Sequence, residues 1–166
     1  MTLDALSKPP ALTVRRATPE DATVLAALRR PFWEDQISKG LLDVPPLDGE
    51  SLLAASELIL KRPRTSTHIA YVGTASAGFV YGQARIVPGI QRSIVAMIEE
   101  LYVDSTHGSA SAALALMRSV IADLRSFGAT RIQAKVLYQN GLSRKFFEFS
   151  GFSPNLIYYE FNDAHR

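Results

Sequence analysis

The chain has 166 residues, of which 47% are apolar and 20% charged, so it is long enough and apolar enough to bury the core of one domain. It has no cysteine, which excludes disulfides, thiolate metal sites and a cysteine nucleophile, and which suits a cytoplasmic location. The net charge of +2 comes from scattered cations that form no nucleic-acid-binding stripe, and no apolar run approaches the roughly 18 residues of a membrane span.

Residues 1–11 contain Asp4, Lys8 and two prolines and have no hydrophobic centre, which is untypical of a signal peptide. We expect them to form a loose tail. Residues 12–166 are expected to form one domain, because they contain no repeat, low-complexity tract or obvious linker.

The first part of the domain is predicted to be a short strand, residues 12–17, followed by two helices. Thr18 can cap a helix with Pro19 at its first position and acids in its first turn. Its buried stripe is predicted to be Val24, Leu25, Leu28 and Phe32. A second helix is expected at residues 49–61, with one face made by Leu52, Leu53, Ser56, Ile59 and Leu60.

The middle of the chain changes to the period of β-strands. Strands are predicted at residues 67–73, 78–87 and 93–103, with a hairpin turn at residues 74–77. Residues 95–98 are all apolar, which indicates a central strand covered on both faces.

The last third alternates helices with strands. A helix at residues 110–127 has an apolar stripe of Leu114, Met117, Ile121 and Leu124. A strand at residues 131–137, a short helix at residues 140–150 and a last strand at residues 156–161 are predicted to follow. The order β-α-α-β-β-β-α-β-α-β predicts an α/β (α+β) domain, with a mixed central sheet flanked by helices.

This order resembles that of the Gcn5-related N-acetyltransferase (GNAT) fold over residues 13–161. Two segments carry the resemblance. Residues 98–114, IEELYVDSTHGSASAAL, are similar to the family's strand–loop–helix signature, and residues 140–152, NGLSRKFFEFSGF, are similar to its C-terminal motif. The resemblance implies an acyl-CoA-dependent N-acyltransferase, most simply an acetyltransferase that uses acetyl-CoA and a direct attack by an amine in a ternary complex.

A run of small residues opens the helix of the first segment. Successive backbone amides at a helix N-terminus bind a diphosphate well, and small residues let the backbone approach it. The run departs from the family pattern, because Gly108 stands where Arg or Gln is usual and Ser111 and Ala113 replace glycines. Close packing of the helix on the sheet is the structural alternative. The expected cradle consists of Gly108, Ser109, Ala110, Ser111, Ala112 and Ala113.

The resemblance also implies a bulged strand whose open edge, at Leu101, Tyr102 and Val103, pairs with the pantetheine arm. A carboxylate near the acceptor amine can act as general base through water. Glu99 and Glu100 precede the expected thioester position, and Glu99 is favoured by its place relative to Val103. An ion pair or an exposed edge position is the alternative for both.

The second segment has Phe147 where many family members have a tyrosine that acts as general acid. Helical spacing predicts Leu142, Phe146 and Phe149 as a core stripe, and places Phe147 with Ser143 on a face toward the cofactor. The leaving thiolate would then be protonated by water or Tyr138, or leave unassisted. An ordinary strand tyrosine is the alternative for Tyr138. The resemblance implies cofactor contacts at Asn140, Ser143, Phe146 and Phe147.

The remaining patterns in the sequence are weaker indications of function. The three histidines have no second ligand at metal spacing, so no metal is expected. His107 adjoins the cradle and either binds a phosphate or is a loop residue that takes no part in binding. Phe32 and Trp33 either line the acceptor pocket, as this region does in the family, or anchor the core.

Two functions from different classes follow. The first is acetyl-CoA-dependent acetylation of a small-molecule or peptide amine, with weak activity if nothing replaces the missing tyrosine. The second is a GNAT-shaped binding or interaction protein with little or no acyl-CoA turnover, indicated by Phe147 and the altered cradle. We expect no nucleic-acid or membrane partner, and a homodimer rests on the resemblance alone.

Overall fold

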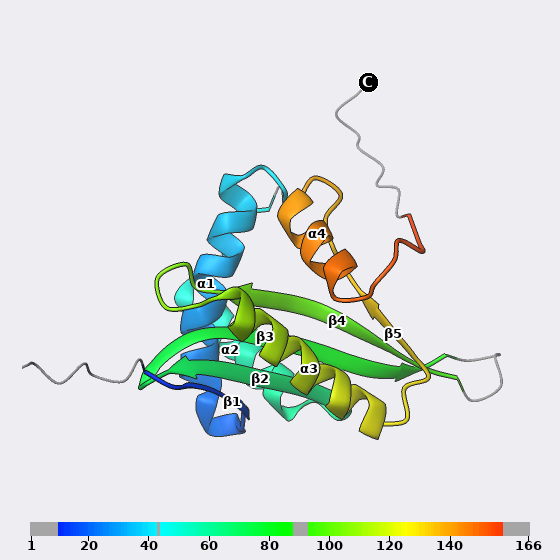
Figure 1. Ribbon diagram of the computed structural model, residues 1–166. Coiled ribbons are helices and arrows are strands. Elements are labelled where there is room, and N and C mark those ends of the chain that lie inside the picture. The colour runs from blue at the N-terminus through cyan, green and yellow to red at the C-terminus, as the bar shows by residue number, and fades with distance from the viewer. Residues whose placement is uncertain (1–9, 43, 88–92, 158–166) are drawn as a thin grey trace, which may run out of the picture.

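The computed structural model describes residues 10–42, 44–87 and 93–157. One five-stranded sheet, in the order β1-β2-β3-β4-β5, has α3 on one face and α1 and α2 on the other (Figure 1). Neighbouring strands are antiparallel except β4 and β5, which are parallel. The elements are β1 (Leu12–Arg16), a 3₁₀ turn (Pro19–Asp21), α1 (Ala22–Ser38), α2 (Gly49–Lys61), β2 (Thr65–Val72), β3 (Ala75–Ile86), β4 (Ile94–Val103), α3 (Ala110–Ser126), β5 (Arg131–Ala134) and α4 (Gly141–Phe149).

The predicted mixed sheet with flanking helices is confirmed, but three boundaries differ. The β2–β3 turn has two residues and not four, because Gly73 adopts a φ of +61° that lets Val72 pair with Ala75. β5 ends at Ala134, three residues earlier than predicted, because its pairing with β4 stops there. Of the predicted last strand, residues 156–157 have no regular structure, and the rest lies outside the described residues.

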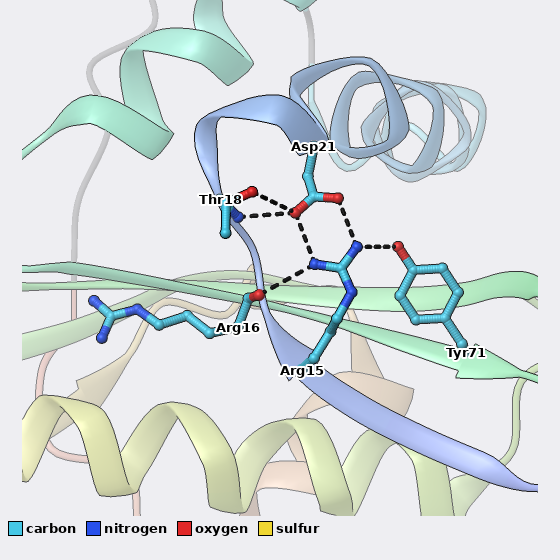
Figure 2. A network of polar contacts seen from close by, with 5 residues as sticks. All are labelled: Arg15, Arg16, Thr18, Asp21 and Tyr71. Atoms are coloured by element: carbon cyan, nitrogen blue, oxygen red, sulfur yellow. Dashed lines mark hydrogen bonds and ion pairs between the residues drawn. The ribbon is translucent and has the colours of Figure 1, made fainter.

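A polar network fixes the junction between β1 and α1 (Figure 2). The Arg15 guanidinium donates to both carboxylate oxygens of Asp21, at 2.8 and 2.6 Å, and to the hydroxyl of Tyr71 on β2 at 2.9 Å. Asp21 also accepts from the Thr18 amide at 2.8 Å. These bonds, above all the one from Arg15, lower the pKa of Asp21 to about 2. The helix therefore enters through a short 3₁₀ turn, and α1 begins at Ala22, later than the Thr18 cap predicts.

Two cores lie on the two faces of the sheet. On one face, Leu25 and Leu28 of α1 and Ile59 of α2 pack with Ile69 and Phe79 of the sheet, as predicted. On the other face, α3 buries a stripe that is shifted from the predicted one. The buried stripe includes the small residue Ala112, which the prediction from large apolar residues left out. Leu114 and Ile121 are only half-buried at the rim. The buried stripe consists of Ala112, Leu116, Met117, Val120 and Leu124.

The central strand β4 is not covered equally on its two faces, contrary to the prediction. Ala96 and Ile98 are buried against the α3 side, whereas Val95 and Met97, on the side of α1 and α2, are only half-buried. Within the described residues, no helix combines the length and apolar character needed to cross a membrane.

Candidate active site

A β-bulge at Glu99 organises the centre of the sheet. On β4, Glu100 pairs with Tyr81 of β3 and Ile98 pairs with Gly82, so Glu99 is an extra residue in the ladder. Consecutive side chains of a regular strand point to opposite faces, and a bulge interrupts that alternation. Glu99 and Glu100 accordingly both lie on the face of α1 and α2, where Glu99 contacts Gln83 and Glu100 contacts Arg29.

Past the bulge, β4 loses its second neighbour. β5 pairs only with Val95–Ile98, and the last backbone hydrogen bond runs from the Lys135 amide to the Ile98 carbonyl at 3.1 Å. β4 and β5 then diverge (Figure 1). The edge of Leu101–Val103 that faces away from β3 has no strand partner in the described part of the chain. Its free backbone groups can therefore bond to an extended ligand that carries amides.

Glu100 is held in a buried ion pair. The Arg29 guanidinium donates to both of its carboxylate oxygens, at 2.8 and 2.7 Å, and the two side chains are 5% and 9% exposed. Arg29 also donates to the Ser56 hydroxyl at 3.3 Å. Arg29, Ser56 and Glu100 therefore connect α1 and α2 to β4. This agrees with the ion-pair alternative for Glu100.

Glu99 has a different environment. Its carboxylate accepts a hydrogen bond from Gln83 Nε2 at 2.7 Å and lies 3.5 Å from the guanidinium of Arg85, with the side chain 19% exposed. Gln83 is itself buried and oriented by Arg62, which donates to its Oε1 at 3.4 Å. Glu99 is therefore positioned by protein groups on one side and still reached by solvent on the other.

The N-terminus of α3 faces solvent beside the open edge of β4. The Ser109 hydroxyl caps the helix by accepting from the Ala112 amide at 3.3 Å, and it lies 2.6 Å from the Ser111 hydroxyl. No protein acceptor bonds the amides of Ala110 and Ser111 within the described residues. Ser109, Ala110 and Ser111 are exposed, whereas Ala112 is fully buried in the α3 core. The exposed turn Ser109–Ser111 is therefore compatible with the predicted cradle, whereas the buried Ala112 agrees with the packing alternative.

Gly108 is required by packing. A Cβ at this position would overlap Val103 and lie 2.5 Å from the Asp104 carbonyl oxygen. The loop is tightened by the Gly108 amide, which donates to that same carbonyl at 2.7 Å. His107 is bound by the Asp104 carboxylate through its backbone amide and Nδ1, at 3.0 and 2.8 Å, and His107 lowers the pKa of Asp104. His107 therefore braces the loop.

The predicted core stripe of α4 is wrong at two of its three residues, because only Phe146 packs against the core, where it is half-buried. Leu142 and Phe149, predicted in the core stripe, are each 80% exposed, whereas Phe147 is 8% exposed and belongs to the α3-side core. Its ring packs edge-on against Phe146 and Phe152, at centroid distances of 5.7 and 5.3 Å. Phe147 therefore anchors α4 to the core. Ser143, one turn earlier, is half-buried.

Asn140 and Tyr138 bracket the start of α4. Asn140 caps the helix as predicted, since its Oδ1 accepts from the Ser143 amide at 3.1 Å. Tyr138 is 81% exposed and lies after β5, not within it, with the Arg144 guanidinium 5.2 Å from its ring centroid. The alternative interpretation, an ordinary strand tyrosine, is therefore wrong, because Tyr138 lies outside the strand.

Phe32 and Trp33 differ in their surroundings. Phe32 packs edge-on against Phe79 and Tyr102, at 6.1 and 6.4 Å, and so links α1 to the open edge of β4. Trp33 lies 5.4 Å from Phe32, and its buried Nε1 has no hydrogen-bond partner in the described residues. It lines a small hollow with Arg30 and Leu47.

Three side chains around the carboxylates were missed by the sequence reasoning: Arg29, Gln83 and Arg85. A signal existed for two of them, because Gln83 and Arg85 lie at period two and are the amide and charged side chains of a strand that otherwise has neither kind. Arg29 gave none, since one arginine of a helical pair looks like solvated surface. The described residues contain no group of three or more His, Cys, Asp or Glu placed to hold a metal.

Comparison with known proteins agrees with this geometry. The model of the acetyltransferase (GNAT) family matches residues 28–152. Aminoglycoside N-acetyltransferase AAC(6')-Iy, solved with CoA, is 19% identical with a TM-score of 0.75, and the match covers 94% of this chain and 98% of that one. Ribosomal-protein-alanine N-acetyltransferase from Brucella melitensis biovar Abortus 2308 is 16% identical, with a TM-score of 0.72 and coverage of 92% and 99%.

Aminoglycoside 6'-N-acetyltransferase AAC(6')-Ih from Acinetobacter baumannii is 18% identical, with a TM-score of 0.72 and coverage of 92% and 99%. No protein with a curated description matches the sequence significantly. At these identities the structures establish the fold, and the family model extends over most of the sequence. The chain therefore belongs to the GNAT acetyltransferase family.

Proposed function

We propose that the protein is an acetyl-CoA-dependent N-acetyltransferase that acetylates an amine by direct attack, with Glu99 as general base. The bulge at Glu99 carries this proposal. The pairing of β4 with β5 ends directly before this extra residue, and Glu99 itself presents a partly solvated carboxylate on the face of α1 and α2, two residues before the unpaired edge.

The residues present fit the cofactor. The free edge of Leu101–Val103 suits the amides of the pantetheine arm, and the exposed turn Ser109–Ser111 offers unbonded amides at the positive end of a 17-residue helix for the diphosphate. Asn140 and Ser143 are our proposed contacts from α4. When bound, acetyl-CoA supplies a thioester whose carbonyl carbon accepts the amine.

Glu99 would remove a proton from the acceptor ammonium through water, which leaves the nitrogen lone pair free to attack. The new C–N bond forms as the C–S bond breaks, the nitrogen releases its second proton to solvent, and the thiolate takes up one proton. Phe147 is buried and has no hydroxyl, so it cannot supply that proton. Tyr138 is our proposed donor, and full activity of Tyr138→Phe would assign the proton to water.

The first experiment is a calorimetric titration with acetyl-CoA. We expect a micromolar dissociation constant that Ser111→Glu weakens about tenfold, because a carboxylate would repel the diphosphate at an exposed position. Ser126→Glu, at the far end of the same helix, is the matched control. Gly108 is unsuited to this test, because any side chain there disturbs packing.

Turnover is tested on a panel of primary amines. Glu99→Gln is expected to lower kcat about 10²-fold with little change in acetyl-CoA affinity, whereas Glu57→Gln on the surface of α2 should have no effect. Binding without turnover on the whole panel would favour the second function, a binding protein of this fold. The buried, hydroxyl-free Phe147 is the observation in favour of that alternative.

A further inference from the structure

The face of the sheet that bears Glu99 also carries two cross-strand rows of side chains. Val95 of β4 pairs with Arg85 of β3 and with Arg131 of β5, which makes the first row. Met97 pairs with Gln83 and Gln133 in the same way and makes the second row. Directly paired residues project to the same face, so each row has an apolar centre and polar ends. We call the two rows the platform.

The platform lies on the face opposite α3. The alternating neighbours on the same three strands, Ala84, Ala96, Ile98, Ile132 and Ala134, pack into the α3-side core. Glu99 shares the platform face, since it contacts both Gln83 and Arg85. The platform therefore leads along the sheet directly to the proposed base.

The platform is accessible. Arg85 is 65% exposed, Arg131 is exposed, and Val95 and Met97 are half-buried. A hollow of about 220 Å³ lies at its far end and is lined by Val87, Ser93, Val95, Arg131 and Gln133. A small molecule can therefore lie on the two rows with one end in this hollow.

The charge of the platform is positive. The neighbouring Glu99 carboxylate is engaged by Arg85. None of the ion pairs in the described residues involves Arg131. Glu99 lies four positions after Val95, which corresponds to roughly 10 to 13 Å of extended strand, because the bulge shortens the path.

We propose that the acceptor is a primary amine that carries a carboxylate or phosphate about 10 Å from its nitrogen, with the anionic group held by the Arg85–Val95–Arg131 row. The connecting chain lies over Met97, between the polar ends of the second row. This inference rests on the proposed acetyltransferase function. A polycation such as an aminoglycoside is disfavoured, because it would place like charges beside two guanidiniums.

Three probes of matched length test this charge preference: ω-aminooctanoate, octylamine and diaminooctane. The wild-type kcat/KM should be at least about tenfold higher for ω-aminooctanoate than for octylamine, and lowest for diaminooctane. Arg131→Glu should lower kcat/KM for ω-aminooctanoate about tenfold through KM, raise it for diaminooctane, and leave octylamine within about threefold. Arg118→Glu, an exposed arginine on α3, is the control with the same charge change.

The outcomes separate the two proposals. If octylamine is acetylated but ω-aminooctanoate is not preferred, or if Arg131→Glu affects all three probes alike, the acceptor inference is overturned and the proposed function stands. If no probe is acetylated, calorimetric titration of the CoA-bound protein with ω-aminooctanoate decides the matter. Binding that Arg131→Glu weakens supports the platform without turnover of these probes. No binding, or binding that Arg131→Glu leaves unchanged, overturns the acceptor inference, and the proposed function is then decided by the acetyl-CoA titration and the amine panel. Comparing aminohexyl phosphate with ω-aminooctanoate, which has the same number of bonds between the nitrogen and the centre of the anionic group, identifies which anion the row prefers.

Discussion

The two halves of β4 have the same strand conformation and opposite roles. Val95–Ile98 is paired on both edges, with β3 and with β5, and its buried side chains serve the core against α3. Glu99–Val103 keeps only β3, and within the described residues no strand pairs with its other edge. One bulged residue separates the halves. A strand can therefore pass from a half that is paired on both edges to a half with one unpaired edge at a single inserted residue, without a loop or a second domain.

The two carboxylates at this boundary sharpen the contrast. Glu100 is enclosed by a bidentate arginine, and Glu99, one residue away on the same face, retains contact with solvent. The first joins helices to the sheet and the second is available for proton transfer. These adjacent glutamates therefore differ in role: Glu100 stabilises the fold, and Glu99 is available for the proposed chemistry.

The largest expected effect comes from breaking the buried pair. Arg29→Met should lower the free energy of unfolding by about 3 to 5 kcal/mol, because Glu100 would be left as an unpaired buried charge. Urea denaturation measures this. The double variant Arg29→Met/Glu100→Leu should recover much of the loss, since it removes both charges. Equal destabilisation in the single and double variants would contradict a dominant role for the unpaired charge.

Deletion of Glu99 tests the boundary itself. Without it, Ile98 and Glu100 become consecutive, so the ladder regains a regular register and the faces alternate correctly on both sides. We expect a folded protein that has lost the base and the divergence of β4 from β5. Its kcat/KM should fall at least about 10²-fold, and its acetyl-CoA affinity should also fall, whereas Glu99→Gln should leave that affinity intact. Unchanged acetyl-CoA affinity in the deletion variant would show that cofactor binding at the edge of β4 does not depend on the bulge.

The same boundary marks how far the sequence alone could lead. Apolar periodicity and turn residues predicted the order of elements from β1 to α4 and the α1–α2 core, because those patterns report burial directly. The bulge was expected only from the resemblance, since an extra residue in a ladder depends on the partner strand. The partner of Glu100 lies 71 residues away on another element, so no local pattern could assign it.

Short amphipathic helices were the other weak point. In α4, four aromatic or aliphatic residues within eight positions are compatible with more than one buried face, and spacing favoured the wrong one. What decides is the point where the helix meets the core, at Phe147 beside Phe152. That contact depends on where the chain returns after Gly151, which helical periodicity does not report.

The smallest expected effect is a pH dependence of stability that arises in the covered part of the sheet and not at the open edge. His68 of β2 is buried, and its Nε2 lies 3.6 Å from Asp123 of α3, which accepts from the Ser66 hydroxyl at 2.8 Å. Burial lowers the pKa of His68 below 6.5, Arg16 adds to this, and Asp123 opposes it.

The unfolded chain therefore binds a proton on His68 more readily than the folded protein does. The free energy of unfolding should fall as pH decreases below about 6.5, and the contribution of neutral His68 is complete above that value. Chemical denaturation at a series of pH values between 5 and 8 measures the slope. His68→Gln should flatten it, and Asp123→Asn should steepen it, because the asparagine keeps an oxygen acceptor but removes the charge that favours the protonated ring. A slope that survives His68→Gln would assign the pH dependence to another group.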